Sequence, residues 1–273
     1  MRPVLFHIGE IAIPSFWAMA FLGFLAALIV VRRQFRERGY DDRLAYDMVL
    51  WAYIGGWVGA RIFVIPAGWN YFVEDPIAFL LSSSGWVWYG GVVGGAAAVL
   101  VWARREGLSL LMIGDIAAPG LAIGLAIGRI GCQLAGDGDY GVPTSLPWGM
   151  SYPDGVVPTT DRVHPTPIYE LIGYLLVFAA IWWQRRRLAP GHALGHYLVW
   201  SAVVRFLVEL LRRNPRWLLG LTTAQAFSIG SIALGAWLLR RPGTAGAHAR
   251  AASSSPPPTP ASTGRESAGI PDA

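Results

Sequence analysis

An arginine lies inside a stretch of this chain that is otherwise apolar enough for a membrane. Arg129 follows the uncharged run 116–127 and begins a glycine-rich, acidic segment that ends at Gly141. Placing a guanidinium at membrane depth costs about 2.5–3.5 kcal/mol or more, so such a group is kept where it pairs with an anion or lines a wet cavity. Asp137 and Asp139 make the end of the segment polar, and its glycines permit tight turns. The segment therefore predicts a site for an anionic ligand.

A second charged group has helical spacing. Arg205, Glu209 and Arg212 stand at i, i+4 and i+7, so they share one face of a helix. The planar fork of arginine matches the oxygens of a phosphate. Arg129 and Arg205, from different helices, would form a clamp for a phosphodiester. The alternative is a structural ion-pair network between the two helices, because buried ions need partners whatever their function.

Acidic residues near these arginines have two interpretations. Glu170 lies one turn into an apolar segment and needs a partner, for which Arg61 and Arg129 are the candidates. Asp137 and Asp139 are candidates for a general base, or else for pairing with Arg129.

Three further side chains are also open to two interpretations. Tyr89 could donate to a ligand oxygen or belong to an aromatic belt. His164, before a proline, is either functional or a loop cap, and Cys132 is interpreted as a small buried residue rather than a nucleophile. The histidines are scattered, so no metal site is predicted. Nucleotide-binding and serine-hydrolase motifs are not found in the sequence.

Composition places the chain among membrane proteins. It has 273 residues, 54% hydrophobic and only 14% charged, whereas soluble domains have about 25% charged residues. All 22 basic residues are arginines, and the net charge is +5. Because the arginines are dispersed between apolar runs, they indicate membrane orientation and contact with anionic lipid rather than binding of nucleic acid.

Seven apolar segments are predicted to cross a membrane, which gives an all-α polytopic fold in a domain of residues 1–241. The predicted spans are 11–31, 45–66, 86–103, 115–135, 166–184, 194–211 and 221–239. Residues 67–84 suit an interfacial loop, and residues 136–165 a functional loop subdomain, which the resemblance described below places on the periplasmic side. The tail, residues 242–273, is rich in Ala, Ser and Pro and is predicted to be disordered.

Arginines follow the first, third, fifth and seventh predicted spans, so the positive-inside rule places the N-terminus outside and the C-terminus in the cytoplasm. With this topology, the unusual polar groups all fall toward the outer ends of their spans. They are Arg61, Tyr89 with Gly90 and Gly91, the segment from Arg129 to Asp139, His164 with Glu170, and Arg205 with Glu209 and Arg212. Their convergence on one face predicts a single site there.

Several motifs, taken in order, resemble those of prolipoprotein diacylglyceryl transferases over about residues 1–240. They are Phe6-His7-Ile8-Gly9, Gly59-Ala60-Arg61, Gly128-Arg129-Ile130-Gly131, Tyr140-Gly141-x-Pro143-Thr144, Leu146-Pro147-Trp148-Gly149, His164-Pro165-x-x-x-Tyr169-Glu170 and Arg205-Phe206-x-Val208-Glu209-x-x-Arg212. The resemblance implies a seven-span transferase of the bacterial cell inner membrane that acts in lipoprotein biosynthesis without a cofactor and whose site faces the periplasm.

The implied reaction moves the diacylglyceryl group of phosphatidylglycerol to the thiol of a lipobox cysteine in a prolipoprotein signal peptide. Glycerol 1-phosphate leaves and a thioether forms. In this reaction Arg129 and Arg205 are expected to bind the phosphate. The expected supporting and substrate-binding residues are Arg61, Glu170, Glu209, Arg212, Gly90, Gly91 and Gly141. The candidates for activating the thiol are Asp137, Asp139, Tyr89 and His164.

The chain departs from the usual pattern of this family, so it is predicted to be a divergent member. Tyr89 stands where a histidine is usual, and Cys132 and Ala135 stand where asparagines are usual. Asp137 replaces a glutamate, and one extra residue follows it. Two alternatives therefore stay open: a phosphatidylglycerol-dependent transferase with another acceptor, and a lipid-binding or transport protein that is not an enzyme.

Overall fold

The structure, a computed structural model, describes residues 1–66, 68–81, 88–216 and 220–241. The helices in these ranges are α1 (Ser15–Glu37), α2 (Asp42–Ile62), α3 (Trp69–Glu74), α4 (Pro76–Leu81), α5 (Trp88–Arg105), α6 (Leu110–Ala135), α7 (Thr166–Gln184), α8 (His192–Glu209) and α9 (Thr223–Arg240). Two antiparallel pairs of strands join them, β1 (Val4–Ile8) with β2 (Ile11–Pro14) and β3 (Met150–Tyr152) with β4 (Thr159–Val163). The predicted disordered tail, 242–273, lies outside the described residues.

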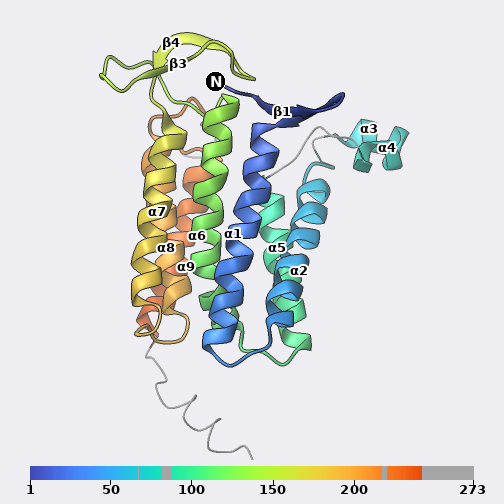
Figure 1. Cartoon of the computed structure of the whole chain (residues 1–273), viewed down its shortest axis with the longest axis vertical. Helices are drawn as coiled ribbons and strands as arrows, with labels where there is room; N and C mark the ends of the chain where they lie inside the picture. Colours follow the sequence, from blue (N-terminus) through green and yellow to red (C-terminus); the bar gives the residue numbers. More distant parts are fainter. Residues whose placement is uncertain (67, 82–87, 217–219, 242–273) are drawn as a thin grey trace, which may run out of the picture. The chain divides into compact units, whose positions relative to one another are not determined.

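The seven long helices, α1, α2 and α5 to α9, lie at the seven predicted segments and run alongside one another (Figure 1). The prediction is wrong at residues 11–14, which form β2 and pair with β1. The turn between these strands contains Gly9 at φ 59°, a left-handed conformation that suits glycine. The predicted interfacial loop also contains two short helices, α3 and α4.

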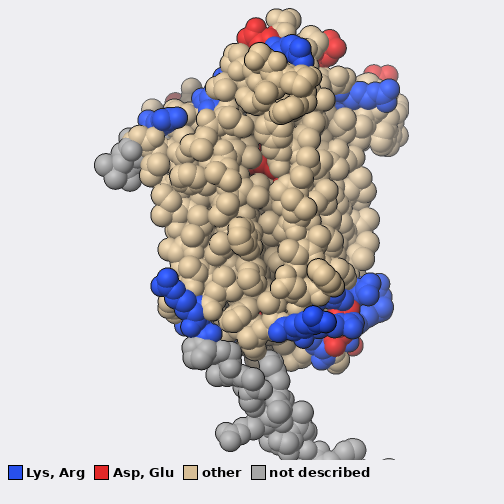
Figure 2. Space-filling model, turned by 90° about the vertical axis from the view of Figure 1, so that its left-hand side faces the viewer, with Lys and Arg blue, Asp and Glu red and all other residues tan. Residues whose placement is uncertain are grey.

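The surface of the helices is that of a membrane protein. Among the described helices, α1, α6 and α7 are long and apolar enough to cross a membrane. Large apolar side chains such as Phe21, Leu176 and Trp183 are exposed on the outer faces, which a bilayer would cover but water would not favour. Figure 2 shows a broad band with very few charged side chains between two charged ends. The apolar helices and their apolar outer surface support the mainly helical membrane fold predicted from the sequence.

Glycines allow the long helices to approach closely. A Cβ atom on Gly59 would lie 2.3 Å from the carbonyl oxygen of Gly90, and one on Gly94 would lie 2.3 Å from that of Gly55. These contacts join α2 to α5 with backbone against backbone, as is usual for helices that pack by van der Waals contact in lipid.

The segment after α6, for which the sequence predicts a loop subdomain, contains a pair of short strands. Helix α6 ends at Gly136, whose left-handed conformation turns the chain out of the helix. Residues 150–163 then form the β3–β4 pair, and isolated bridges join Pro143 to Val163 and Gly141 to Arg212. The second bridge ties the loop to the chain that follows α8. Both strand pairs lie at the same end of the long helices (Figure 1).

Candidate active site

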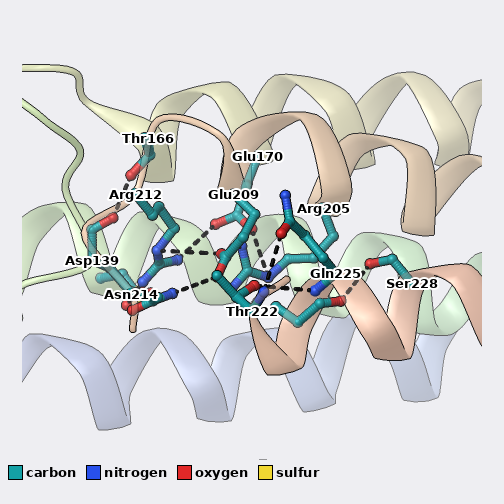
Figure 3. A network of polar contacts seen from close by, with 12 residues as sticks. Asp139, Thr166, Glu170, Arg205, Glu209, Arg212, Asn214, Thr222, Gln225 and Ser228 are labelled. Atoms are coloured by element: carbon teal, nitrogen blue, oxygen red, sulfur yellow. Dashed lines mark hydrogen bonds and ion pairs between the residues drawn. The ribbon is translucent and has the colours of Figure 1, made fainter. Parts of the chain in front are cut away.

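One ion-pair network lies near the end of the helices where the strands are found. Its members come from α6, α7, α8 and the segments that follow α6 and α8 (Figure 3). They are Arg129, Asp139, Glu170, Arg205, Glu209 and Arg212. The sequence singled out all six, and the structure brings them together.

Glu170 is the centre of the network. Its side chain is fully buried, and its carboxylate lies 3.0 Å from Nε of Arg129, 3.6 Å from Nε of Arg205 and 3.7 Å from an Nη of Arg212. The pairing with Arg129 is one that the sequence suggested. A buried carboxylate is tolerated because three cations surround it.

Asp139 bridges two of the same arginines from the loop side. One oxygen lies 2.5 Å from Arg129, and the other pairs with Arg212. Burial by itself would raise the pKa of Asp139, but the two guanidinium groups outweigh that effect and hold the pKa below its ordinary value. Thr166, the first residue of α7, donates its hydroxyl to the backbone carbonyl of Asp139. The loop is therefore fastened to α6, α7 and the end of α8.

Glu209 is also fully buried and pairs along its own helix. Its Oε2 lies 2.6 Å from Arg205, at the i,i+4 spacing read from the sequence, and 4.0 Å from Nε of Arg212. Its Oε1 accepts a hydrogen bond of 2.8 Å from the side-chain amide of Asn214. Asn214 was not predicted, because it lies beyond the end of α8, where helical spacing no longer applies.

The three arginines of the network are matched by three carboxylates. The sequence left open that Arg129 and Arg205 belong to a structural ion-pair network, and the structure contains such a network. The arginines differ in exposure, however: the side chain of Arg205 is 21% exposed and that of Arg129 is 15%, against 7% for Arg212. Arg129 and Arg205 are thus held by carboxylates and keep partly exposed side chains.

Asp137 has a different environment from Asp139. It accepts the backbone N–H of Asp139. Burial, followed by the charge of Asp139, raises its pKa above the ordinary value. The ligand atoms of Cys132, Asp137 and Asp139 lie within 4.8 Å of one another. That spacing would suit a metal ion, but two guanidinium groups already occupy the carboxylate of Asp139.

Tyr89, Gly90 and Gly91 lie at the start of α5. Tyr89 is within electrostatic range of Arg205 and Glu209, and its ring packs at 5.2 Å from that of Phe227. The absent side chain of Gly90 gives room to α2, because a Cβ there would lie 2.5 Å from the Gly59 carbonyl, whereas a Cβ on Gly91 would make an ordinary contact at 3.4 Å. Tyr89 thus adjoins the network, whereas Gly90 serves helix packing.

His164 belongs to a separate set of contacts. Its Nδ1 lies 3.2 Å from the hydroxyl of Tyr169, which also accepts a 2.8 Å hydrogen bond from the indole of Trp148. The backbone carbonyl of His164 accepts the N–H of Gly141. These contacts hold the loop against the first turn of α7.

Arg61 is 2% exposed and lies two residues after Gly59 on α2. It belongs to the α2–α5 pair, whereas α6, α7 and α8 carry most of the network.

The fold and the site together define a class of protein: a helical membrane protein with buried arginines and carboxylates at one end of its helices. The chain matches the family profile described as "Prolipoprotein diacylglyceryl transferase" over residues 3–241. This protein belongs to that family.

Individual relatives agree with the match. The chain is 33% identical over 238 residues to a phosphatidylglycerol–prolipoprotein diacylglyceryl transferase of Clostridium tetani, covering 86% of this chain and 95% of the relative. It is 32% identical over 270 residues to the protein of the same name from Thermus thermophilus, covering 87% of this chain and 97% of the relative. The resemblance inferred from the motifs is therefore confirmed.

Proposed function

We propose that this protein transfers the diacylglyceryl group of phosphatidylglycerol to the thiol of a lipobox cysteine in prolipoproteins. The observation that carries the proposal is the pair of partly exposed arginines, Arg129 and Arg205, held on one fully buried carboxylate, Glu170. A shared buried anchor keeps the two cations in place before the substrate arrives, which is the preorganisation that stabilises developing charge.

The chemistry of the transfer matches these groups. The sulfur attacks the carbon of the diacylglycerol part that carries the phosphate, the bond from that carbon to the phosphate oxygen breaks, and its electrons go to the leaving glycerol 1-phosphate. Arg129 and Arg205 stabilise the phosphate as its charge grows.

The thiol must lose its proton, because the thiolate is the nucleophile. Asp137, whose pKa is raised, suits this role better than Asp139, whose pKa is lowered by two arginines. Tyr89 and His164 are the other proposed participants.

The proposal includes an arrangement in the bacterial inner membrane. All seven long helices cross it, with the N-terminus outside and the network toward the periplasm. The arginines support this orientation, because they gather at the opposite ends of the same helices: Arg36 in the last turn of α1, Arg104 and Arg105 in that of α5, and Arg240 in that of α9. Residues 1–241 would form the transferase domain.

Mass spectrometry tests the proposal. The purified protein, in micelles that contain phosphatidylglycerol, is incubated with a synthetic lipobox peptide and with a Cys→Ser version of the peptide. A diacylglyceryl mass on the first peptide alone is expected. A folded protein that binds phosphatidylglycerol but forms no adduct would favour another acceptor or a binding role.

Variants of the arginines test the phosphate clamp. Arg129→Ala and Arg205→Ala are each expected to reduce kcat by about 10²–10³-fold. Arg43→Ala is the matched control, since Arg43 is largely exposed at the start of α2. A well-folded Arg129→Ala protein with full activity would show that the clamp is wrong.

A further inference from the structure

Glu209 uses its two oxygens for different partners. Oε2 lies 2.6 Å from Arg205, whereas Oε1 accepts a 2.8 Å hydrogen bond from the side-chain amide of Asn214 (Figure 3). The Glu209 side chain is fully buried. A buried carboxylate oxygen that accepts no hydrogen bond destabilises the folded protein. The amide of Asn214 prevents this by donating to Oε1 of Glu209.

The chain around Asn214 holds it in reach of Glu209. After α8 the backbone N–H groups of Leu211 and Arg212 donate to Val208 and Glu209 at 3.0 and 3.2 Å. The N–H of Val142 then donates to the carbonyl of Leu211 at 2.8 Å, which ties this turn to the loop. Asn214 is itself exposed, so its amide reaches Glu209 from the solvent side.

The chemistry of an amide differs from that of the other partners. Asn214 donates a hydrogen bond but brings no charge. It therefore satisfies Oε1 while the negative charge of Glu209 stays available to Arg205. A cation at this position would compete with Arg205, and an anion would repel Glu209.

We propose that Asn214 is a positioning residue of the phosphate site, whose amide orients Glu209 and, through Glu209, the guanidinium of Arg205. The inference rests on the proposed function, since it assigns Arg205 to phosphatidylglycerol. Asn214 touches no reacting atom in this scheme.

The first test compares the kinetics of both substrates in the micellar assay with Asn214→Ala. We expect kcat/KM for phosphatidylglycerol to fall about tenfold, which is the effect of losing one hydrogen bond to a buried charged group. The KM for the lipobox peptide should stay unchanged. Arg213→Ala is the control, because Arg213 is the exposed neighbour of Asn214, and it should leave both constants unchanged.

The second test uses pH. In Asn214→Asp an ionised aspartate would face Glu209, whereas a protonated aspartate could donate in place of the amide. The activity of Asn214→Asp, relative to wild type, should therefore rise as the pH is lowered toward the range where carboxyl groups titrate. Asn214→Ala should show no such recovery, because alanine has no proton to donate.

The outcomes separate this inference from the proposed function. Wild-type kcat/KM in Asn214→Ala would overturn the inference, as would equal losses for both substrates together with a lower thermal midpoint. If the wild-type protein itself forms no thioether, the proposed transfer is wrong. In that case, binding of phosphatidylglycerol to the same variants tests the role of Asn214. Binding by Asn214→Ala that is tenfold weaker than wild type supports the positioning role, and binding equal to wild type overturns it.

Discussion

Removing the charge of Glu170 should destabilise the protein strongly. Glu170→Gln keeps the shape of the side chain but leaves Arg129, Arg205 and Arg212 with two carboxylates instead of three. The Glu170 side chain is fully buried, and its nearest contact is 3.0 Å. Breaking a buried ion pair by neutralising one partner costs about 3–5 kcal/mol, because uncompensated charge stays buried.

Glu37 offers a matched control at the other end of the bundle. It also contacts three arginines, at 3.1, 2.8 and 3.1 Å: Arg33, Arg185 and Arg186. The side chains of Arg33 and Arg186 are 62% and 70% exposed, so water screens these two pairs, whereas the pair with Arg185 is largely buried. Glu37→Gln should therefore cost about 1–2 kcal/mol, less than Glu170→Gln.

Thermal unfolding in one detergent measures the difference. A change of 1 kcal/mol shifts the midpoint by about 2–4 °C in a protein of this size. Glu170→Gln should therefore lower the midpoint by about 6–20 °C, and Glu37→Gln by only about 2–8 °C. Equal decreases would refute the reasoning, since the number of partners rather than burial would then set the strength of the interaction.

Three further predictions follow from single contacts. Gly59→Ala should lower the thermal midpoint, because its Cβ would lie 2.3 Å from a backbone oxygen of α5, whereas Gly56→Ala should be tolerated, because its nearest contact would be 3.5 Å. The lowered pKa of Asp139 means that its ion pairs stabilise the fold fully above the ordinary aspartate pKa of about 3.9 and lose that contribution as the pH falls through the lowered value. Asp139→Asn should therefore flatten the decrease of the thermal midpoint below about pH 4. Cys132, the buried free cysteine, should react with maleimide in the unfolded protein but not in the native one, and native labelling would contradict the burial seen here.

Local features of the sequence were sufficient for much of the fold and part of the site. Apolar runs of membrane length predicted the seven long helices, because helix formation depends on neighbours a few residues apart. The i,i+4 spacing predicted the pairing of Arg205 with Glu209, and the structure confirms it at 2.6 Å. The short apolar run 11–14 was misjudged, because length and periodicity do not separate a short strand from the start of a helix.

Spacing alone could not assign the partners of the remaining charged groups. Glu170 needed a cation, but only the packing of α6, α7 and α8 shows that it has three. Asp139 reaches Arg212 across a sequence separation of 73 residues, through a loop whose path no local rule specifies.

The sequence by itself therefore determined the family, the long helices and the residue types of the site. The tertiary structure decided which charges share a partner, and it alone revealed Asn214 beside Glu209. The physical reason is that helix formation and motif spacing are local, whereas the pairing of buried charges depends on how distant segments pack together.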